Sequence, residues 1–428
     1  MGSDIMRLPY RGGNWNNGAN AGLAALNLNN SRVNTNTNIG FRPAFGSSQK
    51  ATPHGALSSA LSKGCRCLGY RRKTEQAAPV RRAADFKALM YDQIISFDNL
   101  HQAALRCLCG KRTSPAALRY MQRLEEHLHD THNHLLHDSY QPGGYEEFYV
   151  FEPKQRLISA PRFVDRVVHR AIMNVLEPTL DPRFIFDSYA CRKGKGVHAG
   201  ANRAQRWMRA FRQAHGPLFC LKADISKYFA SVDHARLKAI LRRHIHCDRT
   251  LRLLDAIIDS SPGRPGVGIP LGNLTSQLFA NLYLNELDRY AKHDLGIRYY
   301  IRYMDDFVVL HHDKAQLQAW RARIEQFLWS ALRLTTNSKT QIFPVGPDNG
   351  RALDFLGYRI YPTHRLLRKN SIKRIRYKLR RFKRAIAAGR LTAGDCRPCI
   401  QSWCAHAAHA NTWRLRCSLF NISSGANR

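Results

Sequence analysis

The spacing of apolar residues predicts where regular structure begins in this chain. Residues 1–84 show no sustained hydrophobic period, whereas from Asp85 apolar side chains recur every three or four residues, the period of an α-helix. We expect this first helix to run through Leu108. A second helix should begin at Ser114, a favourable N-cap followed by proline, and end near Leu136. The residues of this second helix that we expect to face a core are Leu118, Met121, Leu124, Leu128 and Leu135.

The next segment changes to a strand pattern. Residues 145–161, "YEEFYVFEPKQRLISAP", alternate and are rich in aromatic and branched side chains, which predicts a β-hairpin with Pro153 near its turn. A helix should follow from Val164 to Leu176. Pro178 should end it, because proline has no backbone N–H to donate.

The remainder of the chain mixes helices with short apolar strands. A helix through Trp207 precedes the strand "LFCLKADI", and two helices then reach about Asp259. After a Gly/Pro-rich turn we expect, in order, a helix from Thr275 to Leu295, the hairpin "RYYIRYMDDFVVLHH", a helix from Lys314 to Leu332, and short strands near Gln341–Phe343 and Phe355–Tyr361. Helices mixed with antiparallel strands predict an α+β fold rather than a doubly wound parallel sheet.

Near the C-terminus, "SIKRIRYKLRRFKRAI" predicts an amphipathic helix. Its apolar residues step by three or four and should form one buried stripe. These residues are Ile372, Ile375, Leu379, Phe382 and Ile386. Almost every other position is basic, and so dense a row of one sign favours phosphate contacts along a nucleic acid duplex over a merely solvated face. The basic residues that we expect to make such contacts are Lys373, Arg376, Arg380 and Arg384.

Composition supports a polyanionic partner. The 428 residues include 67 Lys and Arg against 31 Asp and Glu, a net charge of +36, which would repel itself unless a polyanion such as nucleic acid shared the surface. We find neither an apolar run long enough to span a bilayer nor a secretory signal, so we expect a cytoplasmic protein.

Cysteine usage adds little to this interpretation. Eleven cysteines in so long a chain favour reduced thiols over a disulfide framework. The segment "CRPCIQSWCAHAAH" has ligand types suited to zinc, but its spacing matches neither usual zinc pattern, and we favour a helix face over a zinc site.

The most informative chemistry is the pair Asp305-Asp306 within apolar strand residues. Alone, two adjacent carboxylates are most simply a solvated turn. Asp224 changes this interpretation, because it ends the apolar strand "LFCLKADI" and could join the pair. Carboxylates bind Mg²⁺ together with substrate phosphates, and two such ions would clamp the attacking and leaving oxygens of a phosphoryl transfer. We therefore expect nucleotidyl transfer with two Mg²⁺ ions, for which Mn²⁺ could substitute.

Seven segments, taken in sequence order, resemble the conserved segments of a reverse transcriptase. They are "QRLISAPRFVDRVVHRAI", "SYACRKGKG", "LKADISKYFASVDH", "GIPLGNLTSQLFANLYLNELD", "RYMDDFVVL", "LRLTTNSKTQI" and "LDFLGYRI". The resemblance implies a right-hand polymerase with fingers, a palm carrying an antiparallel sheet, and a helical thumb. It implies an N-terminal segment at 1–50, a linker at 51–84, a helical extension at 85–140, fingers and palm at 141–362, and a thumb at 363–428.

The resemblance also assigns roles to single residues. Metal binding falls to Asp224, Asp305 and Asp306, assisted by the carbonyl of Ile225. Lys339 is the general acid for departing pyrophosphate, although a surface lysine is the alternative. The residues assigned to the incoming deoxynucleoside triphosphate are Lys154, Arg156, Arg192, Phe229, Leu271, Gly272 and Gln277. Phe229 matches the gate that excludes a ribose 2′-OH, with a core aromatic as the alternative.

The segment "GIPLGNLTSQLFANLYLNELD", which the resemblance makes the nucleotide-pocket block, departs from the common pattern of this family. Leu271 and Gln277 stand where most reverse transcriptases carry Gln and Pro, which resembles the enzymes of diversity-generating retroelements. These copy a template-repeat RNA into cDNA with errors opposite adenine, and work with a small basic oligomeric accessory protein. Residues 1 to about 46 hold ten asparagines and resemble translated template-repeat sequence, so Met90 is a plausible initiator in place of Met1. A genuine lectin-like fragment is the alternative.

Two other functions remain open from the sequence. One is a reverse transcriptase of the group II intron or retron type. The other, from a different class, is an RNA-binding protein on a catalytically dead polymerase scaffold, against which the intact aspartates argue. For the reverse transcriptase the expected ligands are the template-repeat RNA and an RNA/cDNA duplex.

Overall fold

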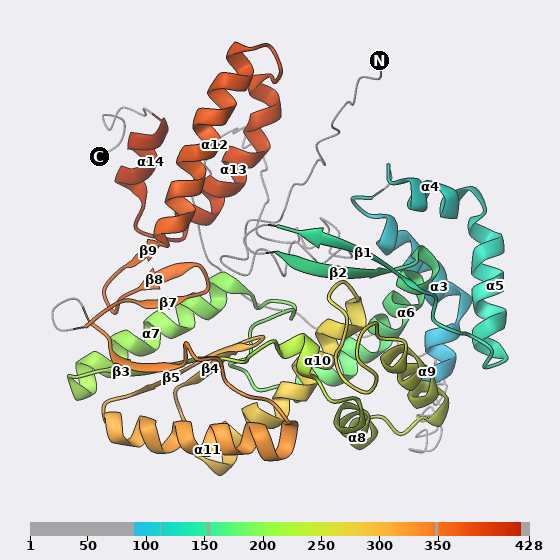
Figure 1. Cartoon of the computed structure of the whole chain (residues 1–428), viewed down its shortest axis with the longest axis horizontal. Helices are drawn as coiled ribbons and strands as arrows, with labels where there is room; N and C mark the ends of the chain where they lie inside the picture. Colours follow the sequence, from blue (N-terminus) through green and yellow to red (C-terminus); the bar gives the residue numbers. More distant parts are fainter. Residues whose placement is uncertain (1–89, 112, 152–154, 347–349, 421–428) are drawn as a thin grey trace, which may run out of the picture.

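The structure is a computed structural model that describes residues 90–111, 113–151, 155–346 and 350–420. Helices and antiparallel strands alternate through these ranges, so the predicted α+β class is confirmed (Figure 1). The Asn-rich segment, the linker that follows it, and the predictions for Pro153 and Lys154 lie outside the described residues.

A four-stranded antiparallel sheet forms the platform of the molecule. Its strands, in spatial order, are β4 (Tyr300–Tyr303), β5 (Asp306–His311), β3 (Phe219–Asp224) and β6 (Gln341–Pro344). Helix α11 (Lys314–Leu332) packs on one face of this sheet, and α7 (Val197–His215) lies on the opposite side (Figure 1). Because β5 is apolar and covered on both faces, its residues between the two ends are all buried.

Helix α10 (Leu274–Arg289) runs through the interior and is buried on nearly every side. It packs against α6, α8 and α11 and therefore joins the sheet platform to the N-terminal half of the described chain. The helix continues as a π-helical turn over Tyr290–Asp294, so the predicted extent to Leu295 is confirmed, with a change of hydrogen-bond pattern at Tyr290.

Helices dominate the N-terminal half of the described chain. Residues 90–95 are helical, and the further elements are α3 (Phe97–Leu108), α4 (Pro115–Gln122), α5 (Leu124–Leu136), α6 (Phe163–Leu180), η3 (Asp181–Arg183), η4 (Tyr228–Ser231), α8 (His234–His244) and α9 (Asp248–Asp259). The single helix predicted from Ser114 to Leu136 is therefore two helices.

The break between α4 and α5 changes which residues reach the core. Arg123 has φ −131° and ψ 45°, which ends the helical register. Leu118 and Met121, predicted to face a core, are 50% and 40% exposed, because α4 buries Ala117 and Tyr120 instead. The predictions for Leu128 and Leu135 are confirmed, since both are buried.

The predicted β-hairpin is confirmed, whereas the predicted end of the following helix is wrong. Strands β1 (Tyr145–Val150) and β2 (Arg156–Pro161) pair antiparallel. Pro178 lies inside α6 rather than ending it. A proline in the last turn removes only one intrahelical bond, and the continuation buries Leu180 completely.

The C-terminal region rises from the platform as a helical unit on a small sheet (Figure 1). Its elements are β7 (Leu353–Phe355), β8 (Tyr358–Ile360), β9 (Arg365–Leu367), α12 (Lys369–Ala387), α13 (Ala393–Ala408) and α14 (Trp413–Phe420). Of the predicted apolar stripe on α12, only Ile375 is fully buried, and Ile386 is exposed. The other stripe residues are half-buried, because α12, α13 and α14 pack around an open groove of about 880 Å³ that Leu379, Phe382 and Ile386 help to line.

None of the helices in the described ranges combines the length and apolar character needed to cross a bilayer.

Candidate active site

Two sequence-distant carboxylates meet where β3 ends and β5 begins. In the antiparallel register of these strands Asp224 is directly opposite Asp306. The next backbone bond continues the pairing, because Ile225 N–H donates to the carbonyl of Asp305 at 3.2 Å. The predicted convergence of Asp224 with the 305–306 pair is therefore confirmed as geometry.

A tight turn presents Asp305. Tyr303 and Asp306 are paired across β4 and β5, which leaves Met304 and Asp305 as the two turn residues. Met304 has φ +55°, in the left-handed region that side chains other than glycine seldom adopt. Strained backbone of this kind persists only where its surroundings hold it.

The carboxylates at this turn repel one another. Burial raises the pKa of Asp305 to about 7, and the charges of Asp306 and Asp224 add to that rise. Burial also raises the pKa of Asp306 to about 6, against the opposing effect of Lys222. A cation beside these groups would favour their ionised forms.

The donor set suits Mg²⁺ or Mn²⁺, since these hard cations prefer carboxylate and phosphate oxygens. Asp224, Asp305 and Asp306 would hold the ions, and the assisting role of the Ile225 carbonyl stays a prediction. Within the part of the chain that the structure describes, no three His, Cys, Asp or Glu side chains already surround a single point. Oxygens from a substrate and from water would complete the coordination.

Asn337 is a site residue to which the sequence pattern assigned no role. Its Nδ2 donates to Asp224 Oδ2 at 3.2 Å, and its backbone N–H donates to the Asp224 carbonyl at 2.7 Å. Its Oδ1 accepts from the backbone N–H of Lys339 at 3.0 Å. Asn337 thus ties the loop of Lys339 to Asp224 and leaves the Lys339 side chain exposed, as a general acid requires. A polar residue two positions before the candidate lysine was the available signal.

The pocket block docks directly on the β1–β2 hairpin. Ser159 N–H donates to the Leu271 carbonyl at 2.9 Å. Gly272 follows with φ +133°, and a Cβ there would lie 2.6 Å from the Ser159 carbonyl oxygen. Glycine is therefore required by both the dihedral angle and the close approach of the two backbones.

Arg156 lies at the turn end of the same hairpin, where it pairs with Val150. Its positive charge opposes the rise in the pKa of Asp305 that burial causes, so the two groups are within electrostatic reach. Its Nε is buried and has no hydrogen-bond partner among the described residues. An unpaired guanidinium nitrogen beside the carboxylates is suited to a phosphate oxygen. Lys154, its predicted companion, lies outside the described residues.

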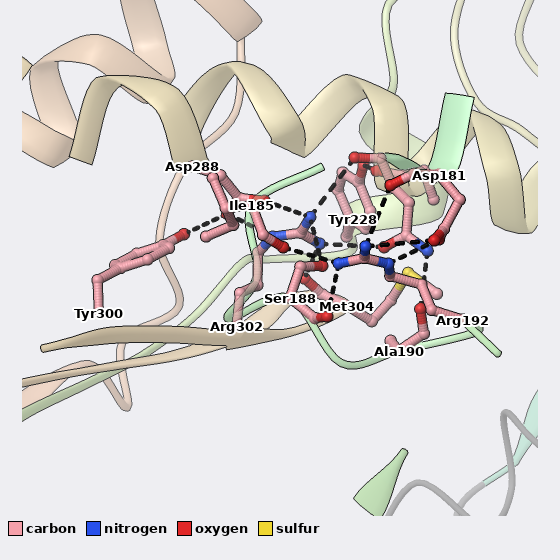
Figure 2. A network of polar contacts seen from close by, with 12 residues as sticks. Asp181, Ile185, Ser188, Ala190, Arg192, Tyr228, Asp288, Tyr300, Arg302 and Met304 are labelled. Atoms are coloured by element: carbon pink, nitrogen blue, oxygen red, sulfur yellow. Dashed lines mark hydrogen bonds and ion pairs between the residues drawn. The ribbon is translucent and has the colours of Figure 1, made fainter. Parts of the chain in front are cut away.

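Arg192 does not fit its predicted role in nucleotide binding. Its guanidinium makes five hydrogen bonds, to Asp181 Oδ1 and Oδ2 and to the carbonyls of Asp181, Ile185 and Ser188 (Figure 2). All five N–H donors of an arginine are thereby occupied. The structure assigns Arg192 to loop architecture, because no donor is left for a phosphate.

Phe229 and Gln277, the other predicted pocket residues, are both half-buried. Phe229 is half-buried in η4, five residues after Asp224, and its carbonyl accepts from Ile269 N–H at 2.8 Å. Gln277 is half-buried in the first turn of α10. Their contacts with a nucleotide stay predictions.

The predicted duplex-binding residues share the exposed surface of α12. Lys373, Arg376, Arg380 and Arg384 are all exposed, and the first three also border the apolar groove of the C-terminal helices. A row of exposed cations on a helix that rises from the small β7–β9 sheet is suited to a phosphate backbone (Figure 1).

Comparison with known proteins identifies this part of the chain. Residues 151–360 match the family model described as reverse transcriptase (RNA-dependent DNA polymerase). Protein YkfC of Escherichia coli strain K12 is 29% identical over 290 residues, covering 58% of this chain and 73% of YkfC. The group II intron-encoded protein LtrA of Lactococcus lactis subsp. cremoris is 24% identical over 166 residues, covering 37% of this chain and 27% of LtrA.

Solved structures include a similar chain, the apo telomerase from Candida tropicalis truncated from its C-terminal domain. The two are 12% identical with a TM-score of 0.42, and the match covers 52% of this chain and 55% of the telomerase.

The raised pKa of Asp305 gives a stability prediction. The ordinary pKa of this group is 3.8, whereas in the folded state it keeps its proton up to about pH 7, so its contribution to stability is present below about pH 4 and is lost progressively as the pH rises to 7. We expect Asp305→Asn to raise the free energy of unfolding by about 1–2 kcal/mol at pH 8, where the loss is complete, and by less at pH 5, where it is partial.

Urea denaturation at both pH values in the presence of EDTA measures this difference. Asp130→Asn, on the exposed side of α5, is the matched control and should change neither value. Equal effects of Asp305→Asn at pH 5 and pH 8 would contradict the assigned shift.

The close approach at Gly272 gives a second prediction. Gly272→Ala should lower the free energy of unfolding by about 1–3 kcal/mol, because a Cβ meets the Ser159 carbonyl in a left-handed conformation. Gly263→Ala is the control, since Gly263 has φ +111° but nothing within 4 Å of its Cβ position. Thermal denaturation of both variants separates the clash from the dihedral strain, and a cost no larger at Gly272 would refute the docking role.

Proposed function

We propose, since residues 151–360 are a reverse transcriptase domain, that the chain copies a template-repeat RNA for a diversity-generating retroelement. The chain is then an RNA-directed DNA polymerase. The cDNA would carry errors opposite adenine and replace a variable repeat in a target gene. The observation that carries the polymerase part is the cross-strand pair Asp224 and Asp306 beside Asp305.

Each residue of the proposed site has a task that its surroundings support. Two Mg²⁺ ions, when bound, supply Lewis-acid stabilisation of the charge that develops on the reacting oxygens. Arg156 binds the triphosphate of the incoming nucleotide with its unpaired Nε, and Lys154 assists as a point charge. Lys339 donates a proton to pyrophosphate from its exposed position.

Choice of sugar falls to Phe229. The residue follows Asp224 by five positions, and the backbone bond from Ile269 to its carbonyl fixes the short η4 helix. A half-buried aromatic ring beside the metal-binding carboxylate excludes a ribose 2′-OH by steric clash and so favours deoxynucleotides.

The template-primer duplex is held by α12. Contacts of Lys373, Arg376, Arg380 and Arg384 with phosphates carry no sequence information, and they leave the polymerase able to move along the template. RNA, cDNA and deoxynucleoside triphosphates are the proposed ligands. A small basic accessory protein, acting as an oligomer, is the further proposed partner.

The retroelement subtype rests on the pocket block and on the N-terminal sequence. Leu271 cannot make the side-chain hydrogen bonds that glutamine would offer near a new base pair, so pairing geometry is checked less strictly. Asn-rich residues 14–38 spell what an unmutated template repeat would encode, since Asn codons with altered adenines reach many residues but never a stop.

A group II intron type of reverse transcriptase is the second candidate. The match to the group II intron-encoded protein LtrA favours it, although the chain spans only 27% of that protein. The two candidates share the same polymerase chemistry and differ in the fidelity expected opposite adenine.

Primer extension tests the polymerase activity. With an RNA template, a DNA primer, deoxynucleotides and Mg²⁺, we expect metal-dependent extension that Asp305→Ala and Asp306→Ala each reduce by at least about a hundredfold. Asp130→Ala should retain full activity because it lies on an exposed helix face. Absence of metal-dependent extension by the unaltered protein would refute both polymerase candidates and favour an RNA-binding function.

Sequencing of the cDNA tests the subtype. Leu271→Gln should lower misincorporation opposite adenine by about fivefold, the effect of one neutral hydrogen bond of about 1 kcal/mol. Leu271→Met keeps an apolar side chain and should leave the error rate unchanged. An unaltered protein with equal error rates opposite all four template bases would reject the diversity-generating assignment and leave the group II intron type.

A further inference from the structure

Arg302 is a fully buried arginine three residues before Asp305. Its guanidinium forms a bidentate ion pair with Asp288 of α10, in which Nε donates to Oδ1 and Nη2 to Oδ2, both at 2.7 Å (Figure 2). Both side chains have no exposed surface. Tyr300 also donates to Asp288 Oδ1 at 2.8 Å, so the carboxylate is held from two residues of the same edge strand.

The remaining donors of Arg302 reach the catalytic turn and its surroundings. Nη1 donates to the carbonyl of Met304 at 3.0 Å and to Asn281 Oδ1 at 3.3 Å. Nη2 donates to Ser188 Oγ at 3.2 Å. The Met304 carbonyl belongs to the peptide that leads into Asp305, so this bond fixes the plane from which the Asp305 side chain projects.

The backbone of Arg302 is held as firmly as its side chain. Its N–H donates to the Asp187 carbonyl, and its carbonyl accepts from Tyr189 N–H, both at 3.0 Å. Asn281 Nδ2 donates to the Ala190 carbonyl at 2.9 Å, which fixes the same 187–190 segment to α10. The strand that leads into the turn therefore has little freedom to shift.

We propose that Arg302, oriented by Asp288, is a positioning residue that sets the conformation of the Met304–Asp305 turn and hence the aim of the Asp305 carboxylate at the metal ions. Stability alone is a weak reason for such a pair, because apolar replacements of buried ion pairs are often neutral or stabilising. The geometric reason is stronger. A planar fork reaches a carboxylate and a carbonyl on different elements at once, which a lysine cannot reproduce.

Arg192 provides a matched control for this proposal. It is also buried, also forms a fork on a carboxylate, that of Asp181, and also binds the 185–188 segment through backbone carbonyls. The hydrogen bonds of its guanidinium go to Asp181, Ile185 and Ser188 and not to the turn at Met304. Arg192→Lys should therefore reproduce the loss of a buried fork without disturbing the aim of Asp305.

The experiment compares Arg302→Lys with Arg192→Lys in the full chain. Three quantities are measured: the thermal midpoint, Mg²⁺ binding by isothermal titration calorimetry, and kcat and KM in primer extension. We expect Arg302→Lys to weaken Mg²⁺ binding and lower kcat by about tenfold or more, with the KM for template-primer unchanged. Raising Mg²⁺ should recover part of the lost kcat. Arg192→Lys should leave Mg²⁺ binding and kcat within about twofold.

The proposal rests on the polymerase activity described above, and the two can fail separately. An inactive unaltered protein refutes the activity, and the Mg²⁺ titration of the two variants then still decides the positioning role. Equal losses in both variants, or unchanged Mg²⁺ binding in Arg302→Lys, would overturn the proposal. If Arg302→Lys does not fold, Asp288→Asn is used, which keeps the volume and should weaken Mg²⁺ binding by the same mechanism.

Discussion

The pairing of β3 with β5 is the constraint on which the site depends. Both strands are largely apolar and buried, so hydrophobic burial fixes their register, and a slip of one residue would turn every side chain to the opposite face. That register sets Asp224 opposite Asp306. Burial raises the pKa values of Asp305 and Asp306, and the charge of Asp224 adds to both rises. The fold therefore tolerates electrostatic repulsion among these carboxylates, which a bound cation would reduce.

The sequence predicts this convergence well, because strand ends are governed by local pattern. Apolar runs that stop at Asp224 and begin again after Asp306 define both strands without knowledge of the tertiary structure. The same local reasoning fails where packing decides. Leu118 and Met121 keep helical spacing but are exposed, since the helix breaks at Arg123 and α4 turns Ala117 and Tyr120 to the core instead. Pro178 is tolerated inside α6 because burial of Leu180 outweighs one lost bond.

Side-chain partnerships are the second limit on prediction. Arg192 and Arg302 both lie in segments that resemble the family's motifs. The resemblance assigns Arg192 to nucleotide binding and gives Arg302 no role. The structure shows each bound to a carboxylate on a preceding element, Asp181 for Arg192 and Asp288 for Arg302. These partners are not marked by any local spacing. Only the folded chain shows which basic side chains are already satisfied and which, like Arg156, keep an unpaired donor.

In the segment of Leu271 and Gly272, attachment of the β1–β2 hairpin can be separated from the role of the side chain at position 271. Leu271 joins the β1–β2 hairpin through its backbone carbonyl, and Gly272 permits the close approach that this join needs. Neither contribution depends on the side chain at position 271. A leucine at this position is therefore compatible with firm attachment of the hairpin to α10. Under the proposed function, weaker discrimination by the side chain at position 271 would not loosen the hairpin, so a low fidelity would carry no cost in stability.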